Sequence, residues 1–259
     1  MIDCKKYADE ILDSVKGYGH LAVVSIGDDP ASQVYIRGKK KDCGKVGFKF
    51  THCAFANGDP EEEIASKIAM LNRDPDVTGI ILQLPVPDGY DAERLAGMIT
   101  KSKDVDGLSK NSPFSPCTPE GILYLLKKEL GDLTGKHAVI IGRGKLVGRP
   151  LAKMLLAEDM TVSICHSKTT PFDLEALTEN ADAIIVAAGA PKHFRLAFTS
   201  PDAVVVDCGV HRTEDGHLCG DVAFAGTDRI TPVPGGVGLL TRAMLIKHVE
   251  RNVTADEKD

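Results

Sequence analysis

The chain has 259 residues, of which 43% are hydrophobic and 26% are charged, so it can bury a sizeable core and is not intrinsically disordered. Its 31 basic and 37 acidic side chains give a formal charge of −6, and no long stretch is strongly basic, which argues against a nucleic-acid partner. The longest apolar runs have the length of strands and are too short to span a membrane.

The N-terminal stretch MIDCKKYADEIL mixes charged and apolar residues at helical spacing. It lacks the apolar core and the small-residue cleavage site of a signal peptide, so we expect a cytoplasmic protein. The seven cysteines are scattered and form no CxxC pair, which favours reduced, mostly buried thiols. Histidines and carboxylates show no metal-ligand spacing, and we predict no bound metal.

In the first part of the chain, helical patterns alternate with short segments rich in β-branched residues. This alternation predicts βαβ units with a largely parallel sheet, and hence an α/β fold. Ser32 is the predicted N-cap of the first helix that follows a strand. The expected strands are residues 20–26, 47–54 and 79–82, and the expected helices are residues 32–46 and 60–72.

Periodicity is lost over residues 101–119, where proline, serine, lysine and aspartate accumulate. Length alone allows two modest domains or one large one, and this irregular connection favours a boundary here. A helix is expected to follow over residues 119–130, with Thr118 as its N-cap and Pro119 at its first position.

A second series of α/β elements begins at His137. The last helix of the chain is expected at about residues 239–252, with Leu240, Met244 and Val249 on one face that packs against another element. The expected strands are residues 137–141, 161–165, 183–187 and 203–207, with helices between the first three.

The segment HAVIIGRGKLVGRP, residues 137–150, runs from a buried strand pattern into a glycine-rich turn and a helix. Its Gly142, Gly144 and Gly148 form a variant of the dinucleotide-binding motif. Such glycines let the backbone approach a pyrophosphate closely, while the N-terminus of the next helix offers unpaired N–H groups. We predict a nucleotide site here. The alternative is a plain glycine-rich turn.

The end of the second strand of this series indicates which nucleotide binds. NAD-preferring folds carry an acidic residue there that binds the ribose 2′-hydroxyl, and this chain has none. Instead Ser167 can donate a hydrogen bond, and His166, Lys168 and Arg143 can supply positive charge. This set would accept a 2′-phosphate, so NADP is favoured over NAD. The alternative is that Arg143 and Lys168 are solvated surface charges.

Polar side chains from three segments form a candidate catalytic set. Tyr35 and Lys39 are four residues apart and so share one face of a helix. Gln83 lies in the apolar segment GIILQLPVP, where its amide needs a partner such as a lysine or a ligand. Asp106 belongs to the segment KDVDG. Taken singly, Lys39 could be a solvated lysine, Gln83 a turn cap and Asp106 an Asx-turn residue.

The chain carries in this order the motifs GDDPASQVYIRGK, GIILQLPVP, KDVDG, PCTPEGI, GRGKLVG, CHSKT, GDV and PVPGGVG followed by Thr241. Together these segments resemble the methylenetetrahydrofolate dehydrogenase/cyclohydrolase family across nearly the whole chain. The resemblance implies a two-domain α/β fold with an N-terminal substrate domain, a Rossmann-type NADP-binding domain and an active site in the cleft between them. The expected folate-binding catalytic domain is residues 1–117 plus 241–259, and the NADP-binding domain is residues 118–240.

The resemblance also implies two reactions on tetrahydrofolate derivatives. Hydride passes from 5,10-methylenetetrahydrofolate to NADP, and the 5,10-methenyl cation that results is hydrolysed to 10-formyltetrahydrofolate. These steps belong to one-carbon metabolism, and with them purine biosynthesis. The family is commonly homodimeric through its NADP domains, so we expect a homodimer.

By the resemblance, four residues form the catalytic set. Lys39 matches the catalytic lysine, Gln83 its hydrogen-bond partner, Tyr35 the tyrosine that stacks along the substrate and Asp106 the carboxylate that holds the pterin. The chemistry agrees, because a carboxylate suits the 2-amino and N3–H donors of a pterin, and a neutral lysine can accept a proton from water. The expected substrate-binding residues are Tyr35, Leu84, Asp106, Pro234, Gly235 and Gly238, and the expected cofactor-binding residues are Thr118, Gly142, Arg143, Gly144, His166, Ser167, Cys208, Val210 and Thr241.

The chain departs from the family pattern in two segments. Gly144 stands where the family usually has serine, so one hydroxyl contact to the phosphates is missing. Leu239 and Leu240 stand where it usually has proline and methionine. Separately, Gly38 beside Lys39 weakens its helix by about 1 kcal/mol relative to alanine.

Three other functions stay open from the sequence. A shikimate-dehydrogenase-like NADP oxidoreductase shares this architecture but would ignore folate. A non-catalytic NADP-responsive protein would not need Lys39, Gln83 and Asp106 together. The third is a dehydrogenase without cyclohydrolase activity.

Overall fold

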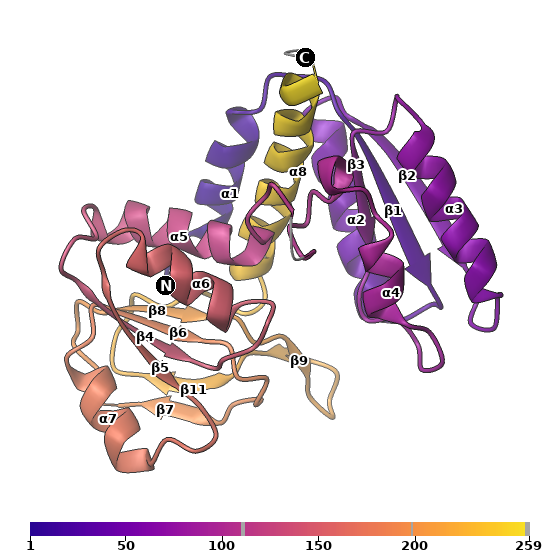
Figure 1. The fold of residues 1–259 in the computed structure, drawn as a ribbon. Helices are drawn as coiled ribbons and strands as arrows, with labels where there is room; N and C mark the ends of the chain where they lie inside the picture. The colour runs from indigo at the N-terminus through magenta and orange to yellow at the C-terminus, as the bar shows by residue number, and fades with distance from the viewer. Residues whose placement is uncertain (110–111, 198, 257–259) are drawn as a thin grey trace. The chain divides into compact units, whose positions relative to one another are not determined.

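The computed structural model describes residues 1–109, 112–197 and 199–256, which fall into two compact units (Figure 1). The C-terminal unit comprises Met1–Ala8 and Pro116–Thr241. The N-terminal unit comprises Asp9–Ser115 and the chain from Arg242 onward. Each unit has its own parallel sheet.

The first residues of the chain belong to the C-terminal unit, whereas the predicted domains placed them with the other one. The backbone N–H of Ile2 donates to the carbonyl of Ile230 at 2.9 Å, and the Tyr7 hydroxyl donates to Glu129 at 2.7 Å. These long-range bonds leave no trace in the local sequence pattern. The assignment of folate and NADP to particular residue ranges stays a prediction.

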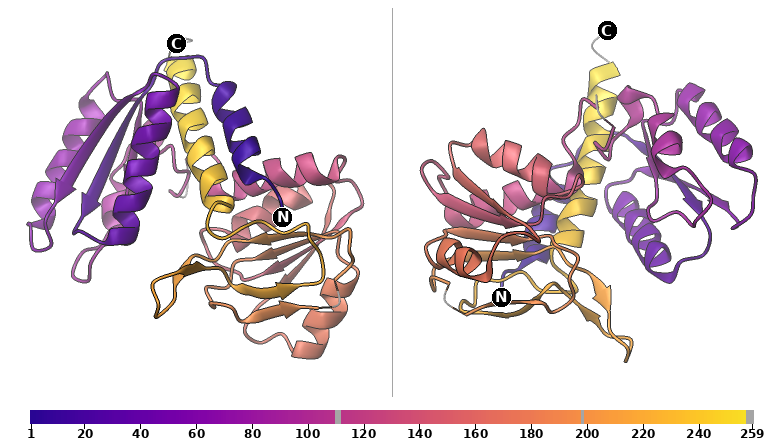
Figure 2. Two further views of the ribbon diagram at one scale, coloured as in Figure 1. Left: turned by 180° about the vertical axis from the view of Figure 1, so that it is seen from behind. Right: turned by 60° about the horizontal axis from the view of Figure 1, so that its bottom comes forward.

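The N-terminal unit is built on a three-stranded parallel sheet of order β2-β1-β3. Helices α2 and α3 lie on opposite faces of this sheet (Figure 2). The strands are thus buried on both sides, which explains the continuous apolar runs of β1 and β3. The elements are β1 (His20–Ile26), α2 (Pro30–Lys45), β2 (Lys49–Phe55), α3 (Glu61–Arg73), β3 (Gly79–Leu82), α4 (Ala92–Gly97) and the 3-10 helix η1 (Lys101–Lys103).

The predicted bounds of α2, β2 and α3 are wrong by one or two residues at each end. The strand expected from residue 47 begins at Lys49, because Gly47 has a φ of +77° and forms the turn after α2. Helix α2 is capped by Asp29 rather than by Ser32, since the Asp29 carboxylate accepts the Ser32 N–H at 2.7 Å. Pro30 fits the first helical position, so the helix begins before Ser32.

The C-terminal unit is built on a four-stranded parallel sheet of order β5-β4-β6-β8. The predicted strands 137–141 and 161–165 are confirmed at their bounds, and the other two differ by one residue at one end. The elements are α5 (Cys117–Leu130), β4 (His137–Ile141), α6 (Gly148–Leu156), β5 (Thr161–Cys165), α7 (Pro171–Glu179), β6 (Ala183–Val186) and β8 (Val204–Asp207). Helix α1 (Cys4–Asp13) begins in this unit and ends in the other.

Four short strands of this unit were not predicted. Strands β7 (Phe194–Leu196) and β11 (Val222–Ala225) form a parallel pair, and β9 (His211–Arg212) and β10 (Leu218–Cys219) form an antiparallel hairpin. Strands of two to four residues are too short for a periodicity to register.

Thr118 is not the N-cap of α5, as predicted, but lies inside its first turn. The helix starts at Cys117, after Pro116. The Thr118 hydroxyl instead lies 3.0 Å from the hydroxyl of Thr241, which is more than a hundred residues later in the chain.

Helix α8 (Val237–Asp256) begins in the C-terminal unit and continues into the N-terminal unit from Arg242. The predicted face of Leu240, Met244 and Val249 is buried, with side chains no more than 2% exposed. In the N-terminal unit, His248 Nδ1 donates to the carbonyl of Val105 at 2.8 Å, which ties α8 to the segment KDVDG.

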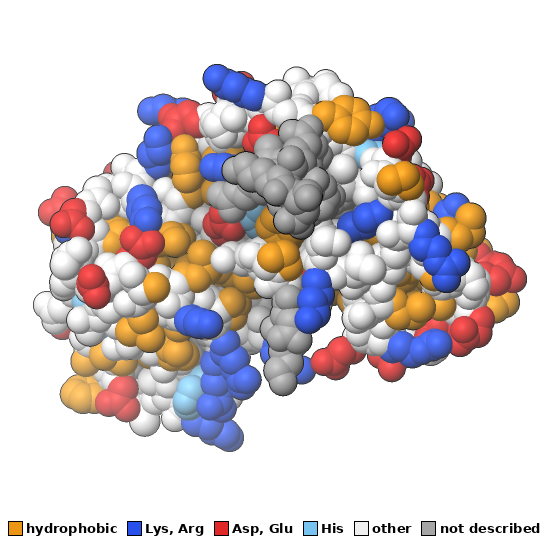
Figure 3. All heavy atoms as spheres, turned by 45° about the horizontal axis from the view of Figure 1, so that its top comes forward, with side chains coloured by type: hydrophobic (Ala, Val, Ile, Leu, Met, Phe, Trp, Pro, Cys, Tyr) orange, Lys and Arg blue, Asp and Glu red, His pale blue; other side chains and the backbone are white. Residues whose placement is uncertain are grey.

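Acidic and basic side chains are interspersed on the face that Figure 3 presents. None of the helices in the described part of the chain has the length and apolarity that crossing a membrane requires. Six of the seven cysteines are buried, and Cys208 is half-buried.

Candidate active site

The central contact of the N-terminal unit joins Lys39 to Gln83. Lys39 lies on α2, is only 9% exposed, and donates from Nζ to Gln83 Oε1 at 2.9 Å. Gln83 directly follows β3, and its backbone N–H donates to Val24 O at 2.8 Å. Its Nε2 donates to the carbonyl of Leu84 at 2.7 Å. Because the amide nitrogen has its own acceptor, the amide oxygen is directed at the lysine.

The other predicted folate residues of this unit lie on α2, directly after Gln83 and in the segment KDVDG. Tyr35 is half-buried, one helical turn before Lys39, and Leu84 is 37% exposed. Asp106 is half-buried and lies in a turn that contacts of the neighbouring Asp104 stabilise. Asp104 bridges to Ile80 of β3, and Asp104 Oδ2 accepts the Ser109 N–H at 3.0 Å.

The remaining predicted folate residues lie in the C-terminal unit. Pro234 and Gly235 are exposed, and Gly235 has a φ of +96°, which few other residues adopt. Gly238 lies in the first turn of α8.

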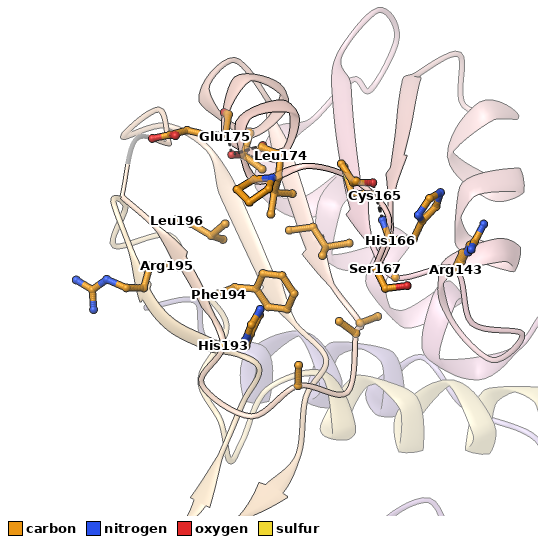
Figure 4. A pocket seen from close by; sticks show the side chains of 18 of the residues that line it. Arg143, Cys165, His166, Ser167, Leu174, Glu175, His193, Phe194, Arg195 and Leu196 are labelled. Atoms are coloured by element: carbon orange, nitrogen blue, oxygen red, sulfur yellow. Dashed lines mark hydrogen bonds between the residues drawn. The ribbon is translucent and has the colours of Figure 1, made fainter.

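A pocket of about 760 Å³ opens in the C-terminal unit at the carboxyl ends of β4, β5 and β6. Figure 4 shows Arg143, His166 and Ser167 at one end of it, and Leu174, Phe194 and Leu196 at the other. In parallel α/β sheets, nucleotides bind at these strand ends, where neighbouring strands run off in opposite directions along the sheet. Here that point lies between β4 and β6, at the centre of the order β5-β4-β6-β8.

The glycine-rich turn forms a cradle that only glycine permits at two positions. A Cβ on Gly142 would lie 2.2 Å from the Ala187 carbonyl oxygen, and one on Gly148 would lie 2.1 Å from the Gly142 oxygen. Gly142 also has a φ of +121°. Gly144 differs, since a Cβ there would meet nothing within 4 Å. The turn thus packs tightly against β6 while leaving open space on the ligand side, which fits a dinucleotide phosphate group.

The polar end of the pocket carries hydrogen-bond donors suited to a phosphate. His166 Nδ1 accepts the backbone N–H of Lys168 at 3.2 Å, so its ring proton resides on Nε2, which is left as a donor. Arg149 Nε donates to the Arg143 carbonyl at 3.0 Å and steadies the turn that carries the Arg143 side chain. Ser167 is exposed beside them.

A second pocket of about 440 Å³ shares Gly144, Ala187 and Ala188 with the first. Cys208 and Val210 line it, as does the buried Asp221. Burial, together with the nearby carboxylates of Asp207 and Asp221, raises the pKa of the Cys208 thiol, so it is a neutral group here. The two pockets form adjoining sections of one binding surface.

Asp221 lines the second pocket, although no role was predicted for it. Its carboxylate accepts the backbone N–H groups of Ala188, Gly189 and Ala190, each at 2.9 Å, and pairs with His211 Nε2 at 2.6 Å. It therefore fixes the loop that lines both pockets. The motif GDV contained the signal, because a carboxylate flanked by Gly220 and Val222 is an unusual choice before a strand.

Asp207 supports the same region from the end of β8. Its carboxylate accepts the N–H groups of Gly209, Asp221 and Val222 at 2.9 to 3.0 Å. Burial raises its pKa despite these bonds. The residue thus holds the backbone of Asp221 in place.

Thr118 and Thr241 line neither pocket, whereas the other predicted cofactor residues do. Their hydroxyls contact each other, and Thr241 Oγ1 donates to the Val237 carbonyl at 3.1 Å. Among the residues that the structure describes, no cluster of three or more histidine, cysteine or acidic side chains could hold a metal ion.

The C-terminal unit has a Rossmann-type sheet, and its glycine cradle and cationic pocket suit NADP. The N-terminal unit holds the buried pair of Lys39 and Gln83. Together these features define a nucleotide-dependent oxidoreductase. Two family models match this chain. The tetrahydrofolate dehydrogenase/cyclohydrolase catalytic domain matches residues 2–106, and the NAD(P)-binding domain of the same name matches residues 116–257. The chain belongs to the tetrahydrofolate dehydrogenase/cyclohydrolase family.

Individual relatives agree with this assignment. The bifunctional protein FolD of Agathobacter rectalis is 42% identical over 96% of this chain and 96% of its own. The crystal structure of the bifunctional FolD methylenetetrahydrofolate dehydrogenase/cyclohydrolase of Campylobacter jejuni is 38% identical, covers 98% of both chains and has a TM-score of 0.88. FolD of Trypanosoma brucei, complexed with NADP and an inhibitor, is 28% identical with a TM-score of 0.89, covering 100% of this chain and 98% of its own.

The predicted fold, function and cofactor are thereby confirmed. The protein is an NADP-dependent methylenetetrahydrofolate dehydrogenase and methenyltetrahydrofolate cyclohydrolase of one-carbon metabolism. The shikimate-dehydrogenase-like, non-catalytic and dehydrogenase-only alternatives are set aside. The roles of individual residues stay predictions.

The two glycines of the turn should respond differently to the same substitution. Gly142→Ala should lower the free energy of unfolding by about 2–6 kcal/mol, because its methyl group meets a backbone oxygen and its backbone conformation is strained. Gly144→Ala, the matched control, should change it by less than about 1 kcal/mol because the space is open. Urea unfolding followed by circular dichroism measures both. Equal stability of the two variants would contradict the cradle.

Proposed function

We propose that Lys39 is the proton-transfer group of the cyclohydrolase step. When water attacks the methenyl carbon, it must lose a proton, and the departing N5 must gain one. The observation that carries the proposal is the hydrogen bond of 2.9 Å between Lys39 Nζ and Gln83 Oε1. This bond holds the buried amine at the carboxyl end of β3, and a lysine amine in its neutral form can accept a proton from water. The amine can therefore act as a base.

The dehydrogenase step makes a smaller demand on Lys39. NADP, when bound, supplies the acceptor for the hydride. No proton moves in that step, because the nitrogen lone pair of the substrate drives the hydride out, so the lysine serves for orientation only. We assign pterin binding to Asp106, stacking along the substrate to Tyr35, and further substrate contacts to Leu84, Pro234, Gly235 and Gly238. The interdomain cleft stays a prediction.

We assign the 2′-phosphate of NADP to Arg143, His166 and Ser167, and the pyrophosphate to the turn of Gly142 and Gly144. The donors at the polar end of the larger pocket support this assignment. Cys208 and Val210 are assigned to the nicotinamide half, together with Thr118 and Thr241, although neither threonine lines the two pockets.

The finer biological setting follows from the resemblance alone. We propose a cytoplasmic homodimer, paired through the NADP-binding domains, whose 10-formyltetrahydrofolate feeds purine biosynthesis. Light scattering on the purified protein should give twice the mass of one chain.

Lys39→Met should nearly abolish cyclohydrolase activity and spare more of the dehydrogenase. The substitution keeps the apolar stem and removes the amine, and lost general acid or base catalysis typically lowers rates by about 10² to 10⁴. Stopped-flow absorbance should reveal accumulating methenyltetrahydrofolate. Lys40→Met, on the next and exposed residue of α2, is the control and should behave as wild type. Wild-type hydrolysis by the Lys39 variant would contradict this role and leave Lys39 with a structural function only.

Arg143→Ala should weaken NADP binding by about 10- to 100-fold and NAD binding far less, because a charge-assisted bond to the 2′-phosphate is lost. Arg195 offers a matched control. It also lines the pocket, but its side chain extends away from it, over the ring of Phe224 at 5.5 Å (Figure 4). Fluorescence titration of both nucleotides measures the ratio. A wild type that prefers NAD, or equal losses for both nucleotides, would contradict the assignment.

Asp106→Ala should abolish folate binding and leave NADP binding within about twofold, because the two ligands are assigned to different units. Calorimetric titration of each ligand separately tests this. If both affinities fall together, Asp106 instead maintains the structure of the turn.

A further inference from the structure

Gly38 is an unexplained residue in the helix that carries Lys39. A glycine inside a helix is unfavourable, and the nucleotide and folate assignments give this one no role. The structure shows what occupies the space of its missing side chain. A Cβ on Gly38 would lie 2.5 Å from Nη1, 2.7 Å from Cζ and 2.9 Å from Nε of Arg242. The guanidinium of Arg242 therefore lies against the backbone of α2, at the residue before Lys39.

The same guanidinium is anchored one turn further along α2. Arg242 Nε donates to Asp42 Oδ2 at 2.7 Å, and the two side chains are only 18% and 7% exposed. Gly38 and Asp42 are four residues apart, so they lie on one face of the helix. Arg242 thus spans the turn of α2 that includes Lys39.

Asp42 and Lys39 act on a common neighbour, which shows that their charges are felt in this part of the helix. Burial and the Asp42 carboxylate together raise the pKa of the Cys43 thiol to about 12, whereas the charge of Lys39 lowers it. A buried carboxylate three residues from Lys39 would favour its charged form if left unpaired. Arg242 supplies the pairing charge.

Arg242 also has a distinctive place in the chain. It is the first residue of α8 that belongs to the N-terminal unit, directly after Thr241 of the C-terminal unit. The point at which the chain returns to the N-terminal unit is therefore fastened to the helix of Lys39.

We propose that Arg242 is a positioning residue for Lys39, acting through Gly38 and Asp42. The guanidinium holds this turn of α2 so that the Lys39 amine reaches Gln83, and it neutralises Asp42. The inference rests on the proposed role of Lys39, but it concerns a residue to which we assign no ligand contact. Gly38, Asp42 and Arg242 form one cluster. Gly38 leaves room for the guanidinium of Arg242, and Asp42 pairs with it.

Kinetics of three variants test this cluster. Arg242→Met and Gly38→Ala should each lower the cyclohydrolase kcat by about tenfold, because a small displacement of a catalytic group is costly. The KM for methenyltetrahydrofolate and the affinity for NADP should stay within about twofold. The triple variant Gly38→Ala, Asp42→Ala and Arg242→Val should recover kcat to within about threefold, because packed apolar groups can replace a buried ion pair.

Two controls separate positioning from general stability. Gly44→Ala lies in the same helix with open space around its Cβ and should raise the melting temperature without changing kcat. Arg229→Met breaks the half-buried pair of Arg229 with Glu129 in the C-terminal unit and should lower the melting temperature only.

The outcomes are distinguishable from failure of the proposed function. If Lys39→Met removes cyclohydrolase activity while Arg242→Met lowers only the melting temperature, the role of Lys39 stands and this inference is overturned. If the triple variant remains as slow as Arg242→Met, the guanidinium is needed for itself and positioning is overturned. Should Arg242→Met not fold, Gly38→Ala and the triple variant still decide the question.

Discussion

The hydrogen bond between Lys39 Nζ and Gln83 Oε1 is the contact on which the chemistry that we propose for the N-terminal unit depends. It joins the middle of α2 to the carboxyl end of β3, so the packing of α2 against the parallel sheet places these two residues side by side. Burying a lysine amine is costly unless it is hydrogen-bonded, and the Gln83 amide oxygen supplies one such bond. A group that must take up and release a proton needs such surroundings.

The C-terminal unit meets a different constraint, which is close approach of backbone to a phosphate-bearing ligand. Gly142 and Gly148 permit the approach by leaving out side chains that would meet carbonyl oxygens. Asp221 fixes the opposite loop through three backbone N–H groups. Charge is supplied separately, at the end of β5, by residues that sequence alone could identify. In the proposed site, the rigid backbone allows close approach of the ligand, and the exposed donors supply the hydrogen bonds and charge.

Local sequence patterns predicted the strands well and the helix caps less well. The strands β1, β3, β4 and β5 appear at their predicted bounds, because short runs rich in β-branched residues between turn residues are typical of strands in a parallel sheet. The caps at Asp29 and Pro116 were missed, since Ser32 and Thr118 offer equally plausible hydroxyls. The ties between Arg242 and Gly38, and between Asp221 and the loop after β6, join distant residues, so only the fold reveals them.

The most direct test of the central contact is a double-mutant cycle on cyclohydrolase kcat with Gln83→Leu and Lys39→Met. Gln83→Leu alone should lower kcat because the amine loses its fixed position. If Gln83 acts through Lys39, adding it to Lys39→Met should lower kcat by no more than about twofold further. Losses that multiply independently in the double variant would contradict this coupling, because the two side chains would then contribute separately.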